Sequence, residues 1–277
     1  MTDASTATLA ELEQKAREIR LAVLDMAARA RTPHIASAFS IVEILVALYY
    51  RVMSVSPERP DDPGRDRFVL SKGHGCMALY ACLADRGFFP EQMLSEYAVD
   101  GGRLAEHPSS KTTPGVEFST GSLGHGLSVG TGIALALRCD APGARVFVVC
   151  SDGEMDSGTV WEAALFAAAH KLERLTVIVD RNRFQATGQT EQIMPLEPLA
   201  LKWRHFGWAV TELDGHDFGA LVAAVGNTPA EPGKPHAVIA RTIKGKGVSF
   251  MENNLVWHYR PPDADEAARA REEILRA

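Results

Sequence analysis

Several features that mark particular classes of protein are scarce or missing in this 277-residue sequence. Only 29 basic residues stand against 35 acidic ones, so the sequence lacks the excess positive charge that a general nucleic-acid-binding surface needs. The four cysteines include no Cys-x-x-Cys pair, which favours free thiols in a reducing cytoplasm over a disulfide framework.

Segments that would direct the chain to a membrane are also missing from the sequence. The first nine residues contain neither the basic nor the apolar region of a signal peptide. The most apolar long stretch, residues 41–55, is interrupted by Glu43 and Arg51 and is too short to cross a bilayer. We therefore predict a cytoplasmic protein whose partners are neither nucleic acid nor membrane.

The hydrophobic pattern predicts helices that alternate with buried strands. Apolar residues recur at helical spacing over residues 9–29, 40–52, 76–86 and 157–172, with Ser157 as a plausible N-cap. Continuous apolar runs at 68–70, 145–150, 175–179 and 236–240 are typical of buried parallel strands. This order predicts an α/β fold with a doubly wound, mostly parallel sheet flanked by helices. No linker or repeat interrupts it, so we predict a single domain over residues 1–277.

Polar residues cluster where three of these predicted strands end, at 151–154, 180–184 and 244–247. Because the carboxyl ends of parallel strands share one edge of a sheet, Asp152 and Asn182 should lie side by side. A carboxylate, an amide oxygen and a main-chain carbonyl near Phe184 suit a hard cation such as Mg²⁺. Gly153 would let a phosphate approach the backbone closely. The alternative is that Asp152 and Asn182 merely cap turns.

The nine histidines divide into groups with different expectations. His34, His74, His107 and His258 sit beside small or turn-forming residues, and imidazole is suited to phosphates and hydroxyl protons. Taken singly, each of these four also fits a structural role. Four other histidines have no assigned function and are expected at surface or helix-end positions: His170, His205, His216 and His236. No HExxH or HxxxH spacing occurs, which disfavours a zinc site.

The glycine-rich segment 119–132 opens a further predicted helix and contains His125. Its small residues permit close packing of helices, either within the fold or at an interface between subunits. The local sequence favours neither alternative.

Together, these motifs resemble a known family. Asp152-Gly153-Glu154, followed by Asn182, is similar to the thiamine-diphosphate motif. Four further segments resemble the N-terminal half of transketolases in order and spacing: Ser71–Gly75, Glu106–Pro108, Thr120–Gly124 and Ser157–Glu162. The resemblance extends over about residues 10–262 and implies a thiamine-diphosphate-binding fold. It also implies that Mg²⁺, or Ca²⁺ or Mn²⁺ in its place, is bound by Asp152, Asn182 and the Phe184 carbonyl.

The resemblance further implies roles for individual residues. His74 and His258 would bind the diphosphate or face the reacting centre, and His34 and His107 would lie near the hydroxyls of the donor ketose. These four histidines are therefore the candidate catalytic residues. Gly121 and Leu123 would lie against the rings of the cofactor. The full set of candidate cofactor-binding residues is His74, Gly121, Leu123, Asp152, Gly153, Glu154, Asn182 and His258.

The activity implied by the resemblance is the transfer of a two-carbon ketol unit from a ketose to an aldose. Single-chain members of the family continue well beyond the length of this sequence. The resemblance therefore implies the N-terminal subunit of a split transketolase, with a separate C-terminal, pyrimidine-binding subunit in an α2β2 heterotetramer. Sugars or sugar phosphates would be the substrates.

Two other interpretations remain open. The alpha subunit of a 2-oxo acid dehydrogenase component shares the Asp-Gly and Asn motif but not this set of histidines. A non-catalytic module that stabilises a partner is the second alternative. Its support is that three positions depart from the pattern of the family: Ser151, Ser157 and Ala186.

Overall fold

The computed structural model describes residues 7–276 and contains, in this part of the chain, one five-stranded parallel sheet. The strand order is β1 (Arg67–Leu70), β2 (Val146–Ser151), β3 (Leu175–Arg181), β5 (His236–Arg241) and β4 (Ala209–Asp214). This architecture confirms the predicted fold class. Only β4 has no counterpart among the predicted strands, because it lies at the edge and is half exposed with charged residues along it.

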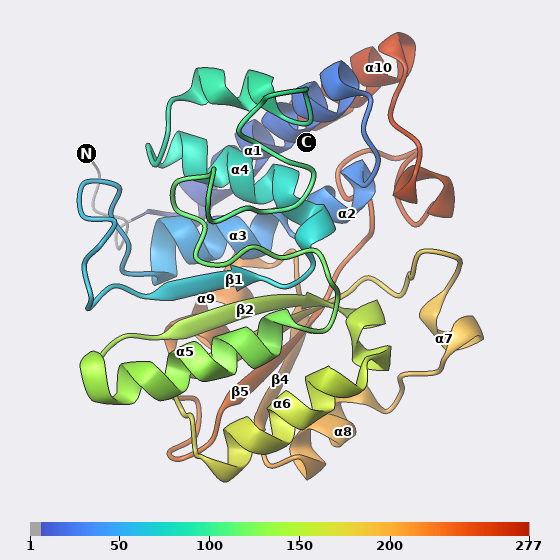
Figure 1. Cartoon of the computed structure of the whole chain (residues 1–277). Helices are drawn as coiled ribbons and strands as arrows, with labels where there is room; N and C mark the ends of the chain where they lie inside the picture. The colour runs from blue at the N-terminus through green and yellow to red at the C-terminus, as the bar shows by residue number, and fades with distance from the viewer. Residues whose placement is uncertain (1–6, 277) are drawn as a thin grey trace.

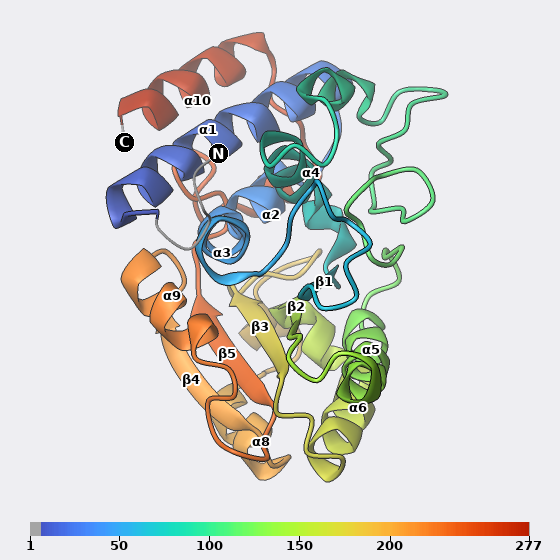
Figure 2. The ribbon, with the colours of Figure 1, turned by 90° about the vertical axis from the view of Figure 1, so that its left-hand side faces the viewer.

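Helices cover both faces of the sheet (Figures 1 and 2). On one face lie α1 (Leu9–Ala30), α2 (Ile35–Phe39), α3 (Val42–Ala47), α4 (Cys76–Asp85) and α9 (Phe218–Gly226). The outermost helix, α10 (Ala264–Arg276), packs against α1. On the other face lie α5 (Gly126–Asp140), α6 (Gly158–Ala169) and α8 (Leu199–His205). The short α7 (Thr190–Ile193) lies beyond the carboxyl edge of the sheet.

The sheet separates two hydrophobic cores, because successive side chains of a strand point to opposite faces. On β2, Phe147 and Val149 pack toward α1–α4, whereas Val146 and Val148 pack toward α5 and α6. All six residues of β2 are buried, as the continuous apolar run predicted. Burial on both faces holds the strand in one position and one register in the sheet. The positions of the residues that follow the strand are therefore also fixed.

The helix predicted over residues 40–52 is divided in the structure. It consists of a turn at Ser40 and Ile41, which directly follows α2, then α3, and a π-helical turn, η2 (Leu48–Val52). The interruption turns the Ser40 hydroxyl toward Asp180 at the end of β3, at an Oγ–Oδ2 distance of 2.8 Å. This polar contact explains a break that hydrophobic periodicity does not reveal.

The predicted surface positions of two histidines were wrong. His236, expected at the surface, is the first residue of β5 and only 1% exposed. His216 is largely buried, with Nδ1 3.0 Å from Glu43 Oε2 and Nε2 accepting a hydrogen bond from the Ile243 N–H. Ser157 is the N-cap residue of α6, as predicted, although its hydroxyl makes no capping hydrogen bond. Within residues 7–276, no helix is long and apolar enough to span a membrane.

Candidate active site

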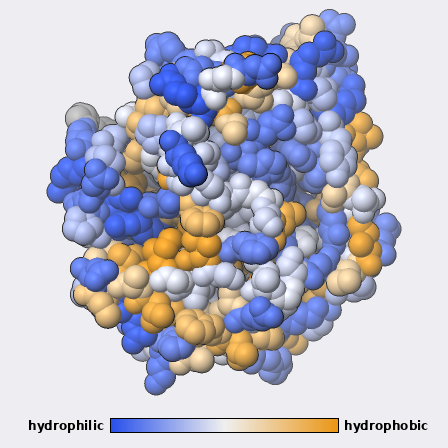
Figure 3. Space-filling model, viewed as in Figure 1, coloured by the Kyte–Doolittle hydropathy of each residue, from blue (hydrophilic) through white to orange (hydrophobic). Residues whose placement is uncertain are grey.

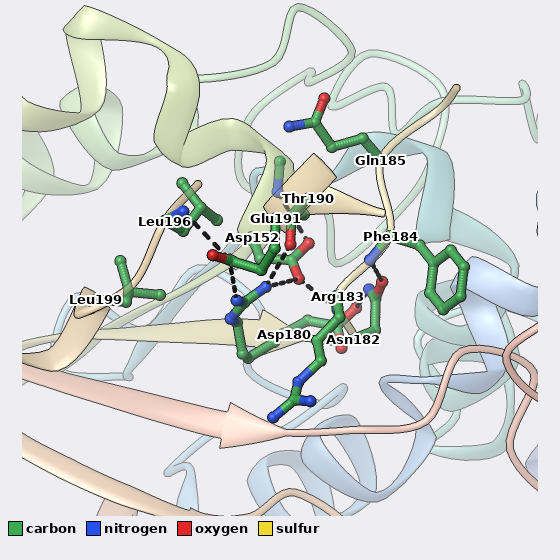
Figure 4. Close-up of polar contacts among 12 residues, drawn as sticks. Asp152, Asp180, Asn182, Arg183, Phe184, Gln185, Thr190, Glu191, Leu196 and Leu199 are labelled. Atoms are coloured by element: carbon green, nitrogen blue, oxygen red, sulfur yellow. Dashed lines mark hydrogen bonds and ion pairs between the residues drawn. The ribbon is translucent and has the colours of Figure 1, made fainter. Parts of the chain in front are cut away.

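The carboxyl edge of the sheet, between α2 and α7 in Figure 1, brings the predicted polar clusters together. β2 and β3 are paired so that Ser151 lies opposite Asp180, which places the residues that follow each strand side by side. The main-chain N–H of Arg183 donates to Asp152 Oδ2 over 2.6 Å. Asp152 and Asn182 are therefore neighbours, as the sequence predicted, and Figure 4 shows them at the ends of the two strands.

The carboxylate of Asp152 is fully buried and is oriented by three donors. Oδ2 accepts hydrogen bonds from the Arg183 N–H and from Arg181 Nη1, and Oδ1 accepts one from the Gly153 N–H at 2.9 Å. Burial and the nearby charge of Asp180 raise the pKa of Asp152 to about 6, despite the opposing effect of Arg181. An additional positive charge beside this buried carboxylate would stabilise its ionised form.

Asn182 lies close to Asp152, and Phe184 follows it two residues later in the chain (Figure 4). Asn182 is buried, and its Nδ2 donates to Asp180 Oδ2 over 2.8 Å. The amide oxygen therefore faces the other way, where it accepts a hydrogen bond from the Phe184 N–H at 3.0 Å. Both residues line a cavity of about 680 Å³. No group of three or more His, Cys, Asp or Glu side chains in residues 7–276 is arranged to hold a metal, so a cation here depends on this mixed set of oxygens.

Two buried lysines lie at the same edge, and although the sequence pattern singled out the segments that contain them, it assigned neither lysine a role. Lys72, after β1, is fully buried and donates to Asp180 Oδ2 and to the Ser37 carbonyl, whose oxygen is 3.0 Å away. Lys244, after β5, is 1% exposed and donates to Ser37 Oγ over 2.9 Å. Burial and the charge of Lys72 lower the pKa of Lys244 to about 8. Their positions in the sequence could have indicated a functional role, because each lysine follows a strand and lies within a glycine-rich segment.

Three of the four candidate catalytic histidines form one cluster. The ring centroid of His34 lies 5.2 Å from that of His74 and 5.0 Å from that of His258. Burial, followed by the charge of Lys244, lowers the pKa of His34 to about 4 and that of His258 to about 3. The pKa of His74 is also well below its ordinary value, chiefly through burial. All three rings are therefore neutral near pH 7.

Buried polar atoms in this cluster have hydrogen-bonding capacity left over. His34 Nδ1 and His258 Nδ1 are both inaccessible to solvent and have no hydrogen-bond partner within residues 7–276. The same holds for the hydroxyl of Thr120, which lies next to Gly73. Buried polar groups without partners are rare and costly, so three of them in one region indicate a polar ligand.

His107 and Gly121 lie beside this cluster. A Cβ atom at Gly73 would stand 3.1 Å from His107 Cδ2, and one at Gly121 would stand 3.3 Å from the same atom. Glycine at both positions therefore allows the half-buried imidazole of His107 to lie close to the backbone. The structure thus brings His107 to the cluster, next to the glycine-rich segment.

Leu123 and Glu154, both predicted to bind cofactor, occupy very different environments. Leu123 is 44% exposed, which leaves its apolar side chain available to a ring. Glu154 is fully buried and both of its carboxylate oxygens are engaged: Oε1 by the Gly124 N–H and the Ser71 hydroxyl, Oε2 by the Ser151 N–H. The structure therefore favours Glu154 as a support for the glycine-rich segment over a residue that contacts a ligand.

The histidine cluster predicts that acid destabilises the ligand-free protein. The unfolded chain takes up protons near the ordinary histidine pKa of 6.5, whereas folded His34 and His258 stay neutral down to about pH 4 and pH 3. This contribution to stability is complete above pH 6.5 and is lost progressively as the pH falls from 6.5 toward and through these folded values. We expect the midpoint of thermal unfolding, followed by circular dichroism, to fall between pH 7 and pH 5.

Asp152 acts in the opposite direction over part of this range. Its folded pKa of about 6 exceeds the ordinary 3.8, so its contribution is complete at low pH and is lost as the pH rises through 6. One carboxyl offsets only part of the effect of three rings. A His34→Gln variant should show a smaller loss of stability between pH 7 and pH 5. An unfolding midpoint that is constant or rises toward pH 5 would contradict the prediction.

Known proteins are similar to this chain in both sequence and fold. Residues 12–275 match the family model described as transketolase, thiamine diphosphate binding domain. The chain is 43% identical to the 6-deoxy-6-sulfo-D-fructose transketolase subunit of Clostridium sp. strain MSTE9, covering 90% of each chain. It is 42% identical to an apulose-4-phosphate transketolase subunit of Actinobacillus succinogenes, covering 95% of this chain and 96% of that one.

Longer transketolases match over only part of their length. Human transketolase is 33% identical over 96% of this chain and 42% of its own. Among solved structures, transketolase from Campylobacter jejuni superimposes with a TM-score of 0.90 at 26% identity, over 97% of this chain and 43% of that one. Transketolase from Leishmania mexicana gives a TM-score of 0.88 at 30% identity, over 97% and 41%. The chain therefore belongs to the transketolase family of transferases and corresponds to the thiamine diphosphate binding domain of its members.

Proposed function

We propose that this chain is the diphosphate-binding subunit of a two-chain transketolase, which transfers a two-carbon ketol unit from a ketose to an aldose. The observation that carries the proposal is the juxtaposition of Asp152 and Asn182 with two buried lysines and three neutral histidines at one edge of the sheet. Oxygen ligands for a cation, positive charge for a diphosphate and groups that exchange protons are thus adjacent.

The residues present fit thiamine diphosphate and a divalent cation. In this proposal Asp152, the Asn182 amide oxygen and the Phe184 carbonyl hold Mg²⁺, while Lys244 and the main chain at Gly153 lie against the diphosphate. The unpartnered nitrogen of His258 and the hydroxyl of Thr120 provide the donors that a phosphate or a polar ring requires. Bound thiamine diphosphate would supply the electron sink for cleavage of the carbon–carbon bond next to a ketose carbonyl.

The histidines would handle the hydroxyl protons of the sugar. Neutral imidazole has one nitrogen that donates and one that accepts, and His34 and His258 each have a free nitrogen in the described part of the chain. Because their pKa values lie well below 7, these rings accept a proton only transiently and return it readily. His74 and His107 would orient the same substrate from the adjoining wall.

A separate subunit would complete the site. The relatives named as subunits match this chain over nearly their whole length, whereas the single-chain transketolases are more than twice as long as the matched region. Leu135 on α5 and Leu165 and Phe166 on α6 also remain exposed. Figure 3 shows hydrophobic surface in the lower half of the view, where Figure 1 places these two helices. We propose that the C-terminal, pyrimidine-binding subunit covers this face and the rim at Leu123 in an α2β2 assembly.

Reconstitution tests the proposed function. The chain should be purified with and without a C-terminal transketolase subunit from the same source and assayed for ketol transfer. Ketoses carrying a phosphate or a sulfonate form the first substrate panel, because the two subunit relatives are named for such sugars. We expect activity only when both chains, thiamine diphosphate and Mg²⁺ are present, and we expect light scattering to give the mass of a heterotetramer.

Two outcomes of this experiment would overturn the proposal. Decarboxylation of pyruvate without cleavage of any ketose would indicate a 2-oxo acid dehydrogenase component instead. A stable complex that binds no thiamine diphosphate would indicate a partner-stabilising module.

A further inference from the structure

Arg181 is a buried cation to which the sequence motifs assign no role. It is the last residue of β3, directly before Asn182, and its side chain is only 3% exposed. Every N–H of its guanidinium group has an acceptor. Nη1 donates to Asp152 Oδ2 at 3.0 Å and to Thr190 Oγ1 at 2.8 Å, and Nη2 donates to Glu191 Oε1 at 2.6 Å. The second Nη2 hydrogen and Nε both donate to Glu197 Oε1.

The acceptors come from two different parts of the molecule. Asp152 directly follows β2. Thr190, Glu191 and Glu197 belong to the segment that contains α7, which we call the α7 segment (residues 190–199). Figure 4 shows Thr190, Glu191, Leu196 and Leu199 gathered beside Asp152. Arg181 is thus the side chain through which the α7 segment reaches the buried carboxylate.

The α7 segment depends on the same carboxylates for its own shape. Glu191 Oε1 also accepts a hydrogen bond from the Leu196 N–H at 3.2 Å, and Glu197 Oε2 accepts one from the Leu199 N–H at 2.9 Å. Exposed ion pairs contribute little on their own. Here, however, the shared cation is buried, and a buried cation left without its acceptors is strongly unfavourable. The conformation of the segment is therefore tied to Arg181.

Arg181 also determines which oxygen of Asp152 is free. Arg181 and the Arg183 N–H together occupy both lone pairs of Oδ2, while Oδ1 accepts only the Gly153 N–H. A cation that approaches Asp152 therefore meets Oδ1, with its direction already fixed. Without Arg181 the carboxylate is freer to rotate and to present either oxygen.

We propose that Arg181 is a positioning residue that couples the α7 segment to the Asp152 carboxylate, so that cation binding and the docked conformation of the segment stabilise each other. The inference rests on the proposed function in one respect, namely that Asp152 binds a divalent cation together with thiamine diphosphate. A lysine at this position keeps the charge but has three donors in place of five, so it cannot satisfy all the acceptors on both sides.

The test measures Mg²⁺ binding in the presence of thiamine diphosphate by isothermal titration calorimetry, in the complex with the partner subunit. Three variants are compared with the natural chain: Arg181→Met, Arg181→Lys and Glu191→Gln. Loss of a group that orients a metal ligand typically weakens binding by about 10–100-fold, and we expect about 10-fold for Arg181→Met. Arg181→Lys should recover only part of this loss. Glu191→Gln should weaken binding about threefold in the natural background and not at all in Arg181→Met.

Limited digestion with chymotrypsin gives a second readout that does not depend on catalysis. Phe184 and Leu196 flank α7 and are sites for this protease. Mg²⁺ with thiamine diphosphate should slow cleavage there in the natural chain and leave it unchanged in Arg181→Met. The matched control is Glu231→Gln, which removes a comparable carboxylate from an exposed pair with Lys234. It should change neither readout.

The possible results separate the coupling from the proposed function. Normal Mg²⁺ binding by the natural chain, combined with additive effects of Arg181→Met and Glu191→Gln, would overturn the coupling alone. So would protection of the segment that persists in Arg181→Met. If the natural chain binds no Mg²⁺ with thiamine diphosphate, the proposed function fails, and the coupling fails with it. Should Arg181→Met not fold, Glu191→Gln still decides, because its surface carboxylate affects the cation only through Arg181.

Discussion

An Asp152→Asn variant should lose Mg²⁺-dependent binding of thiamine diphosphate. The substitution keeps the shape of the side chain and one acceptor oxygen but removes the negative charge that a hard cation requires. Loss of a buried charged partner costs about 3 kcal/mol or more in binding, which corresponds to roughly 100-fold in affinity. We expect calorimetric titration of the partner complex with thiamine diphosphate to give this loss with Mg²⁺ and no change without it.

The control for this prediction is Asp217→Asn. Asp217 is the N-cap of α9, where its carboxylate accepts a hydrogen bond from the Ala220 N–H, and asparagine caps a helix as well as aspartate does. This variant should bind cofactor normally. Circular dichroism must also show that Asp152→Asn remains folded. A folded Asp152→Asn protein with undiminished, Mg²⁺-dependent binding would refute the assignment of Asp152 as a metal ligand.

The second large effect is expected on stability, from Lys72→Met. Burial alone would raise the pKa of Asp180, but the charge and hydrogen bond of Lys72 outweigh it, so this pKa lies below its ordinary value. Removing the lysine leaves a fully buried carboxylate without its cation. Breaking such a pair costs about 3–5 kcal/mol, and we expect a loss of this size in the free energy of unfolding, measured with urea.

A double variant distinguishes loss of the ion pair from a simple packing defect. Adding Asp180→Asn to Lys72→Met removes the uncompensated charge, and the double variant should be more stable than Lys72→Met alone. Lys234→Met provides the surface control, because its pair with Glu231 is exposed and should contribute less than about 1 kcal/mol. Equal destabilisation by the single and double variants would show that the charge of Asp180 does not matter.

The sequence was sufficient to predict the parts of the fold that depend on regular patterns. Continuous apolar runs identify β2, β3 and β5 because these strands are buried on both faces. The strand pattern also predicted that Asp152 and Asn182 lie side by side, because residues that follow adjacent parallel strands are neighbours. β4 was not predicted because most of its residues are partly or fully exposed and two of them are acidic, so it lacks a continuous apolar run.

Contacts between distant parts of the chain could not be predicted in this way. Lys72 and Lys244 belong to residue types that are normally exposed, and only the fold reveals that both are buried around Ser37. Glu154 is adjacent to the metal motif, yet its carboxylate holds the glycine-rich segment instead. The acceptors of Arg181 lie up to 29 residues away in the sequence, with no periodic relation to it.

The structure also explains two of the three positions that depart from the family pattern. Ser151 forms a capping box with Glu154, which turns the chain at the end of β2. Ser157 lies directly beneath Gly124, where a Cβ atom would stand 2.6 Å from the Cβ of Ser157, so the two residues pack closely. Nothing in the structure explains Ala186.

The contact between His34 and His258 has a consequence for how the protein is made. The two rings lie far apart in the sequence, and the His34 N–H donates to the His258 carbonyl over 3.0 Å. All three proposed metal ligands are synthesised long before His258, so a nascent chain carries the cation ligands while one wall of the cofactor pocket is still missing. The complete pocket therefore forms only late in translation, after every strand of the sheet has been synthesised.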